Sequence, residues 1–250
     1  MNKKLKPAPE NFELECSTVW SFPRRWNWAT HNSKYRWNWS PEVVRNIILR
    51  YSNEWDFLLD PMIWWWTTAI ECKLLNRNLF AFDVNTDSLE LTKNLLNFDS
   101  EFNLSIEVNY WDAIEKHVNI KDESIDLILT HPPYVDIIKY SEWKIENDLS
   151  NIHDLDKFCD EIEKVATECY RVLKKDKYCA ILIWDTRRNK LYQPLAYKVM
   201  DRFLKVWFVL KEDIIKQQYN CKATWYWKTS SQKYNFLLIM HEHLFIFKKL

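Results

Sequence analysis

The 250-residue chain contains no glycine. Average usage of about 7% would place roughly 17 glycines in a chain of this length. Glycine serves most positions that need a positive φ angle or a close approach of the backbone to a ligand, because it has no Cβ. The chain has 15 tryptophans instead, and three stand in a row at residues 64–66, where we expect a turn between a strand and a helix. An indole is unsuited to such a turn.

We therefore interpret many of the tryptophans as glycines misread in translation, for instance from UGA codons that the source organism decodes as glycine. This hypothesis predicts that glycine fits the suspect positions better than tryptophan does. The alternatives are a hydrophobic cluster and an engineered glycine-free chain. Both are weaker, because a random loss of glycine would not fall so selectively on turn positions.

The overall composition limits the classes of protein to consider. Lys and Arg number 35 and Asp and Glu number 35, so the formal net charge is zero. This balance argues against binding of nucleic acid by global basicity and leaves a local basic face open. The 47% hydrophobic and 28% charged content is that of a soluble globular protein. The length suits one α/β domain.

The six cysteines form no CxxC pair and do not cluster with histidine at zinc spacing. We expect free, buried thiols in a reducing compartment, and no metal site. The first residues carry charge without a following apolar stretch, and no run of 18 apolar residues occurs. These patterns predict neither a signal peptide nor a membrane span, and therefore a cytoplasmic location.

Short apolar runs alternate with helical patterns from about residue 41 onward. We predict a first helix over 41–51, with Ser40 as N-cap and Pro41 at the first helical position. The alternation predicts a mostly parallel α/β sheet with helices on both faces, whose ligands bind beyond the carboxyl ends of the strands. Further helices are predicted at 67–78, 86–98 and 155–175; strands at 56–60, 79–83, 106–110, 125–130 and 179–183; and an antiparallel pair at one sheet edge from 208–218 and 235–249.

The turn after the first predicted strand reads DPMIWWWTTAIE, or DPMIGGGTTAIE with glycine restored. A glycine-rich loop that leads into a helix N-terminus lets backbone N–H groups approach a nucleotide-like ligand. Asp83 follows at the tip of the second strand, at the spacing where a carboxylate accepts the ribose hydroxyls of an adenosine cofactor. Asp112, after the third strand, is expected either to accept the adenine amine or to serve as an ordinary turn residue.

A second motif, His131-Pro132-Pro133-Tyr134, ends the fourth strand. Two prolines hold the backbone extended, which fixes the preceding carbonyls as outward acceptors. The aromatic ring of Tyr134 offers a stacking face. Such a turn suits a flat heterocycle with an exocyclic amine. For this turn alone, a rigid strand exit with a packed tyrosine would be the better explanation; beside the first loop it is not.

These two motifs resemble those of the S-adenosylmethionine-dependent amino-methyltransferases of DNA, the N6-adenine and N4-cytosine class. That family pairs a DPxxGxGTT cofactor loop with a [DNS]PP[YFW] catalytic turn. The segment HNSKYRWNWSPEVVRNIILRY is similar to the family's segment that packs over the methionine end of the cofactor, and the order of the three is one of the family's arrangements. The resemblance covers residues 18–248, including VWSFP, HPPYVDIIKYS, CAILIWDTRR and HEHLFIFKK.

The resemblance implies a Rossmann-like, seven-stranded, mostly parallel sheet of the class I methyltransferases, with helices on both faces and an antiparallel edge strand. It implies one domain over 1–250, with a loose lead at 1–17, a cofactor-covering segment at 18–55 and a catalytic core at 56–250. It implies methylation of an exocyclic amine of a base in DNA, by a catalytic turn made of His131, Pro132, Pro133 and Tyr134. The implied contacts of S-adenosyl-L-methionine are Asp60, Pro61, Met62, Trp64, Trp65, Trp66, Thr67, Thr68, Asp83 and Asp112.

Against the family's pattern we expect most tryptophans to be glycines and a few to be genuine. The expected glycines are Trp26, Trp37, Trp55, Trp64, Trp65, Trp66, Trp111, Trp184, Trp207 and, less firmly, Trp225. The expected genuine tryptophans are Trp20, Trp28, Trp39 and Trp227. Trp143 is left open.

Two departures limit what the resemblance implies. His131 replaces the usual aspartate, asparagine or serine, so the methylated base does not follow from it, and a structural role stays open. No large insertion supplies a recognition domain, so specificity is low or comes from a separate specificity or nuclease partner. Arg187 and Arg188 are candidate phosphate contacts or part of a solvated turn. His241 and His243 are read as structural.

Two other functions stay open. Methylation of RNA is one, because tRNA guanine-N2 methyltransferases use a similar [DN]PPY turn; those enzymes usually carry an additional N-terminal RNA-binding domain. A non-catalytic nucleotide-binding domain is the other, and it becomes the better reading if the printed tryptophans are real. A role in restriction–modification is implied by the resemblance alone.

Overall fold

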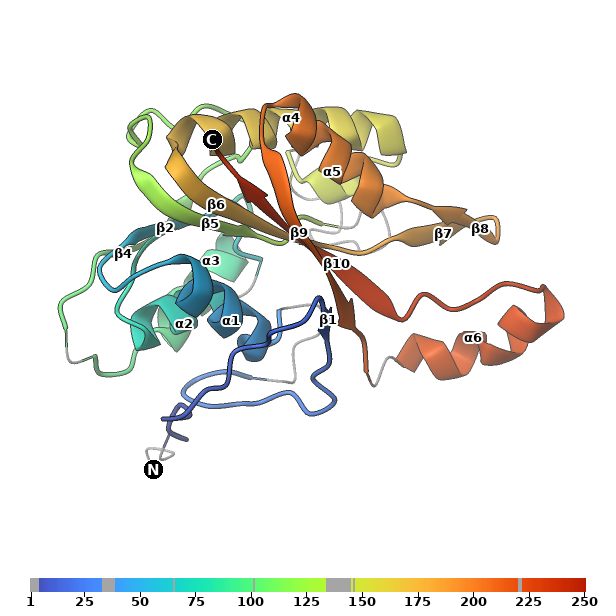
Figure 1. Ribbon diagram of the computed structural model, residues 1–250, viewed down its shortest axis with the longest axis horizontal. Helices are drawn as coiled ribbons and strands as arrows, with labels where there is room; N and C mark the ends of the chain where they lie inside the picture. The colour runs from blue at the N-terminus through green and yellow to red at the C-terminus, as the bar shows by residue number, and fades with distance from the viewer. Residues whose placement is uncertain are drawn as a thin grey trace.

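Eight strands form one sheet in the order β1-β9-β10-β6-β5-β2-β3-β4 (Figure 1). The computed structural model describes residues 5–32, 39–64, 66–100, 102–133, 145, 147–219 and 222–250. The strands are β1 (Val19–Trp20), β2 (Phe57–Asp60), β3 (Asn78–Asp83), β4 (Ile106–Tyr110), β5 (Ile125–Thr130), β6 (Leu173–Ile183), β9 (Val209–Gln217) and β10 (His241–Lys248). A separate hairpin is formed by β7 (Thr186–Arg188) and β8 (Leu191–Gln193).

The prediction of a mostly parallel sheet is confirmed. Strands β4, β3, β2, β5 and β6 are parallel neighbours, and β10 pairs antiparallel with both β6 and β9. Two details differ from the expectation. The antiparallel strand β10 lies inside the sheet rather than at its edge, and the short strand β1 adds an eighth member by pairing in parallel with β9.

Helices cover both faces, as predicted. Adjacent residues on one strand point to opposite faces, so Leu58 packs in one core and Leu59 in the other. The Leu58 core lies under α1 (Pro41–Tyr51), α2 (Thr67–Leu74) and α3 (Thr86–Leu95), and the Leu59 core under α4 (Leu155–Val172) and α5 (Leu195–Lys205) (Figure 1). A 3₁₀ turn spans Leu149–Asn151, and α6 (Lys222–Lys233) lies between β9 and β10.

Several boundaries differ from the sequence pattern for local reasons. Helix α2 ends at Leu74 rather than at 78, because Asn76 adopts a positive φ of 61° and the chain turns into β3. The last strand begins at His241 rather than at 235. The sequence pattern did not predict α5, α6 or the β7–β8 hairpin. Cys16 is exposed, which corrects the expectation that the thiols are buried; Cys72, Cys159, Cys169 and Cys179 are buried and free, and Cys221 lies outside the described residues.

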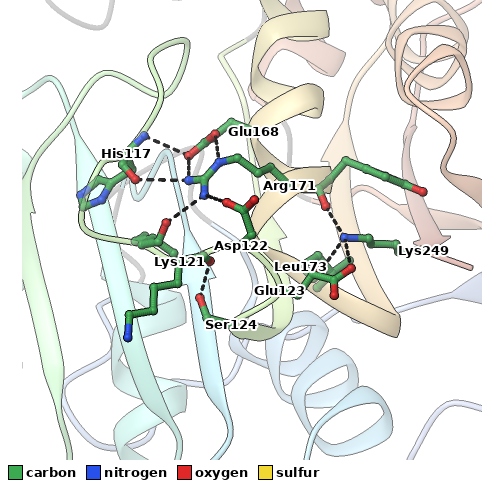
Figure 2. A network of polar contacts seen from close by, with 11 residues as sticks. His117, Lys121, Asp122, Glu123, Ser124, Glu168, Arg171, Leu173 and Lys249 are labelled. Atoms are coloured by element: carbon green, nitrogen blue, oxygen red, sulfur yellow. Dashed lines mark hydrogen bonds and ion pairs between the residues drawn. The ribbon is translucent and has the colours of Figure 1, made fainter.

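Arg171 fixes the segment that enters β5 at the amino edge of the sheet. Its guanidinium contacts the carboxylates of Glu168 and Asp122 and donates to the carbonyls of His117 (3.2 Å) and Ile120 (3.0 Å) (Figure 2). Beside it, Lys249 donates to the carbonyls of Tyr170 and Leu173, both at 2.8 Å. This network holds the amino end of β5 in place. The turn that begins at His131 follows the other end of the same strand. In the part of the chain that is described, no helix is long and apolar enough to cross a membrane.

Candidate active site

The carboxyl ends of β2, β3, β4 and β5 meet at one edge of the sheet, because these strands are parallel neighbours. The strand order also changes direction here, since β3 lies on one side of β2 and β5 on the other. Ligands of open α/β sheets bind at such a switch point. The sequence of this edge therefore decides what the fold can bind.

The loop after β2 is held against β3. The Ile63 N–H donates to the Phe82 carbonyl (2.8 Å), and Ser88 of α3 donates through its hydroxyl to the Trp64 carbonyl (3.0 Å). Asp60 is buried at the end of β2 and accepts from the Met62 N–H (3.3 Å). Burial raises the pKa of Asp60 to about 7, against hydrogen bonds that lower it. Trp65 lies outside the described residues.

Asp83 ends β3 in a similar way. Its carboxylate accepts from the Asn85 N–H at 2.8 Å, and the Asn85 side chain caps α3 by accepting from the Asp87 and Ser88 N–H groups. Burial raises the pKa of Asp83 to about 7. Asp112 follows β4, accepts from the Ile114 N–H (3.2 Å), and has its pKa raised by burial as well. The edge thus carries carboxylates that the protein holds partly dehydrated.

His131 lies buried directly after β5, with the edge of its ring toward the ring of Trp39; the centroids are 5.5 Å apart at 82°. Burial lowers the pKa of His131 to about 4, and the charge of Glu242 opposes this shift. The imidazole is therefore neutral near pH 7. Pro132 and Pro133 continue the turn, whereas Tyr134 lies outside the described residues.

A cavity that is open to solvent unites these loops. Of the predicted site residues, seven line it: Pro61, Met62, Trp64, Asp83, Asp112, His131 and Pro133. Asp60, Trp66, Thr67, Thr68 and Pro132 belong to the same loops but are not among its lining residues. The sequence reasoning missed Val84, Asn85, Ala113, Asn147, Asp148 and Leu149, which also line it.

Asn85 lies two residues after Asp83 in the sequence, and this proximity could have indicated that Asn85 also lines the cavity. Residues 147–149 carried no motif that could have done so. The cavity supports the reading that the two predicted loops form one site.

Trp111 narrows the cavity beside Asp112. Its ring packs edge-on against those of Phe82 (centroids 5.2 Å apart) and His117 (4.9 Å), and its buried Nε1 has no hydrogen-bond partner among the described residues. A buried indole normally has a partner for this N–H. The unmatched donor agrees with the hypothesis that glycine belongs at this position.

The segment upstream of β2 is joined to α2 by a buried carboxylate. Glu71 of α2 is fully buried and accepts from Trp28 Nε1 (2.6 Å) and Arg45 Nε (2.8 Å), with His31 Nε2 at 2.7 Å. The Arg45 guanidinium also lies over the Trp28 ring at 5.0 Å. These contacts hold residues 28–31 and α1 against the helix that follows the β2 loop.

The remaining candidates lie farther along the same edge. Arg187 donates through Nε to the Leu237 carbonyl (3.0 Å), and Arg188 is half-buried in β7. His243 Nδ1 lies 3.0 Å from Asp213, which agrees with a structural reading of this histidine. In the described ranges, no group of three His, Cys, Asp or Glu side chains is arranged to hold a metal ion.

Known proteins with similar sequences identify the family of this chain. The family model of the N6/N4 methyltransferases, described as DNA methylase, matches residues 1–94 and 125–250. The type II methyltransferase M.HpaI from Haemophilus parainfluenzae is 30% identical over 132 residues, which are 52% of this chain and 38% of that protein. The chain therefore spans well under half of this relative's length.

Solved structures share the fold. A SAM-dependent methyltransferase from Methanosarcina mazei matches with a TM-score of 0.55 at 12% identity, over 82% of this chain and 97% of that chain. TrmN from Thermus thermophilus matches with a TM-score of 0.56 at 15% identity, over 86% and 50%. Identities this low show the fold alone. The family model, in contrast, covers most of the chain, including the β2 loop and the turn after β5. The chain belongs to the N6/N4 DNA methylase family.

Proposed function

We propose that this chain transfers a methyl group from S-adenosyl-L-methionine to an exocyclic amino nitrogen of a base in DNA, either N6 of adenine or N4 of cytosine. The observation that carries the proposal is the shared cavity. Its lining brings Pro61 and Met62 together with Asp83, Asp112 and His131. Membership of the DNA methylase family supports the choice of reaction.

The polar groups of the cavity fit an adenosine-bearing cofactor. In the proposal, Asp83 accepts the ribose hydroxyls and Asp112 accepts the adenine amine, while the loop over 60–68 surrounds the methionine end. Trp64 and Trp111 occupy part of the lining, so we propose that glycine stands there in the natural protein. When bound, S-adenosyl-L-methionine supplies an electrophilic methyl group on a sulfonium.

The catalytic turn would act by positioning. The carbonyls of His131 and Pro132, held by the following prolines, would accept hydrogen bonds from the target amine, and the neutral His131 ring can accept as well. Tyr134 would stack on the base after it leaves the helix, which offsets part of an unstacking cost of a few kcal/mol. The attacking nitrogen then needs no covalent enzyme intermediate.

We extend the proposal to the organisation of the chain. Residues 18–55 would cover the cofactor, 56–250 would form the catalytic core, and 1–17 would be a loose lead to a single domain of 1–250. The contacts of Glu71 with Trp28 and Arg45 support the assignment of residues 18–55 as a segment that packs on the core. We further propose a cytoplasmic location and a separate specificity or nuclease partner.

The reaction is tested with labelled methyl donor and the glycine-restored chain. The protein is incubated with genomic DNA or with bulk tRNA, which is then digested to nucleosides. Label in N6-methyladenine or N4-methylcytosine of DNA is expected. Label in tRNA alone would replace DNA with RNA as substrate, and label in neither, despite bound cofactor, would favour a non-catalytic domain.

The role of the turn is tested by Tyr134→Ala. We expect weaker DNA binding and slower turnover with unchanged affinity for the cofactor, because the ring contacts only the base in this scheme. Tyr110→Ala removes an exposed tyrosine near the same edge and serves as the control. Unchanged turnover in Tyr134→Ala would contradict the assignment.

A further inference from the structure

Two segments at the carboxyl edge of the sheet have no part in the site described above. One is the β7–β8 hairpin, which follows β6, and the other is the connection between β9 and β10 that contains α6. Strand β9 is parallel to β6, because both pair antiparallel with β10. Both segments therefore leave the sheet at the edge that carries His131, and Figure 1 shows them extending from the same end of the molecule.

Direct contacts join the two segments. Arg187 of β7 donates through Nε to the Leu237 carbonyl (3.0 Å), and its guanidinium lies 5.3 Å from the centre of the Phe236 ring. Lys190, in the hairpin turn, places its ammonium 3.5 Å from the centre of the Tyr234 ring. Residues 186–193 and 225–237 thus form one continuous surface, which we call the arm surface.

The charge of these segments differs from that of the whole chain, which has equal numbers of acidic and basic residues. No acidic residue occurs between Asp185 and Asp201, or between Asp213 and Glu242. The basic residues in these two stretches are Arg187, Arg188, Lys190, Lys198, Lys216, Lys222, Lys228 and Lys233. Lys198 and Lys216 pair with Asp156 and Glu242, and the other basic residues create a positive local field beside the site. Lys190, Lys228 and Lys233 are exposed and can contact an anion.

Exposed rings lie among these lysines. Tyr226 and Trp227 project from α6 with their ring centroids 5.2 Å apart, and both are exposed, as is Tyr192 of β8. Aromatic rings interleaved with basic side chains are typical of surfaces that bind opened nucleic acid strands, because every base has a face that stacks. Trp225 has no part in this argument, since it is among the suspected glycines.

We propose that the arm surface binds DNA on either side of the target base, with Lys190, Lys228 and Lys233 contacting backbone phosphates. This inference rests on the proposed function, because that function supplies the partner. It also gives the chain its own DNA-binding element without a separate domain. The exposed rings among the lysines favour DNA over an acidic protein surface, because they can stack on bases. The absence of acidic residues disfavours a second copy docked through the same surface, since like charges would be brought together.

The test removes the three lysines from the full chain. The variant carries Lys190→Gln, Lys228→Gln and Lys233→Gln. The control carries Lys121→Gln, Lys175→Gln and Lys211→Gln, which make the same charge change on exposed residues at the opposite edge. Binding of a fluorescein-labelled DNA duplex of mixed sequence is measured by anisotropy over a range of salt concentrations, without methyl donor. Thermal unfolding confirms that both variants fold.

Each lost phosphate contact is expected to lower the slope of log K against log salt by about 0.9. If variant and parent bind equally at about 1 M salt, each lost contact makes the variant bind roughly eightfold more weakly than the parent at about 0.1 M salt. We expect this loss in the arm variant and not in the control. Equal affinity of both variants for the DNA duplex would overturn the inference. So would a finding, by size-exclusion chromatography of the same proteins, that the arm variant loses self-association while its DNA binding is unchanged. Because this readout involves no methyl transfer, it is independent of whether the proposed reaction occurs.

Discussion

Two tryptophans of the N-terminal segment, Trp20 and Trp28, and two of the surface turns, Trp55 and Trp207, occupy opposite environments. Trp28 is 2% exposed, donates to Glu71, and lies under the Arg45 guanidinium. Trp20 is buried equally and donates to the Ser17 carbonyl (2.9 Å). Trp55 and Trp207, in contrast, have φ angles of 70° and 76° and are largely exposed. The first pair uses the indole, whereas the second has a backbone conformation that favours glycine.

The tryptophans around the cavity form a third group. Trp66 precedes α2 and is fully buried, and Trp111 is buried with an N–H that has no partner among the described residues. Burial alone therefore does not identify a genuine tryptophan. The sign of the φ angle, and whether the indole N–H has a hydrogen-bond partner, separate the groups more sharply than exposure does. Trp37, Trp65 and Trp143 lie outside the described residues, so the comparison does not extend to them.

The largest predicted effect separates two neighbours, Trp26 and Trp28. Trp28→Ala should lower the free energy of unfolding by about 3–5 kcal/mol, because it removes a large buried ring. Trp26→Ala should change it by at most about 0.5 kcal/mol, because that side chain is 61% exposed. Urea unfolding of both variants measures the difference. Similar losses in the two would break the distinction between genuine and misread tryptophans.

The next effect concerns the cavity. Replacing Trp64, Trp65, Trp66 and Trp111 together by glycine should raise the affinity for S-adenosyl-L-methionine by at least about 100-fold, or roughly 2.7 kcal/mol. The reason is that the indoles of Trp64 and Trp111 take up cavity space that the cofactor needs. Isothermal titration calorimetry measures this affinity. Replacing Trp55 and Trp207 instead is the control, and it should leave the affinity unchanged. Tight binding by the chain as printed would contradict the glycine hypothesis.

Much of the fold and the site follows from the sequence because strand ends are local features. Asp60, Asp83 and His131 each close a short apolar run, and parallel pairing brings such ends together whatever the loops contain. The residues that were missed come from loops. Asp148 reaches the cavity through the chain that follows the turn after β5, and no periodicity indicates where such a segment returns.

The elements that were not predicted include one whose pattern was overlooked and two to which the same limit applies. Helix α5 has buried residues Leu195, Val199 and Phe203 at helical spacing, so its pattern was available in the sequence. Helix α6 has an exposed surface and no apolar stripe among its described side chains. The segment that follows it contacts the hairpin, where Tyr234 lies under the Lys190 ammonium. Strand β1 is two residues long, and its pairing with β9 depends on tertiary structure rather than on its own sequence.

A smaller effect is expected in the dependence of stability on pH. Burial raises the pKa of Asp83 to about 7, above its unfolded value of about 3.9. The folded state therefore binds more protons between these values, so this carboxyl alone should make stability fall as pH rises from about 4 to 7, by at most about 1.4 kcal/mol per pH unit. Asp60, whose pKa burial also raises to about 7, adds a similar fall. Asp83→Asn should therefore make the total fall shallower, and Asp87→Asn, at an exposed site on α3, should not. Denaturant midpoints across this range measure it.

This pH effect also sharpens the comparison of tryptophans. If glycine replaces Trp64 and Trp111, water enters the cavity and the desolvation that raises the pKa of Asp83 weakens. The glycine-restored chain should then lose less stability over the same pH range than the chain as printed. An unchanged pH profile would mean that these indoles do not keep the carboxylate dry.

The smallest effect concerns the exposed turns. A bulky residue with a positive φ costs about 1–2 kcal/mol, so Trp207→Gly, and likewise Trp55→Gly, should raise the free energy of unfolding by roughly 1 kcal/mol each after the entropy of glycine is deducted. Trp207→Ala is the control, because alanine removes the indole and keeps the Cβ that causes the strain. Urea midpoints should rise for glycine and not for alanine. Equal shifts would attribute the gain to removal of an exposed apolar ring, and the conformational argument for glycine at these turns would then fail.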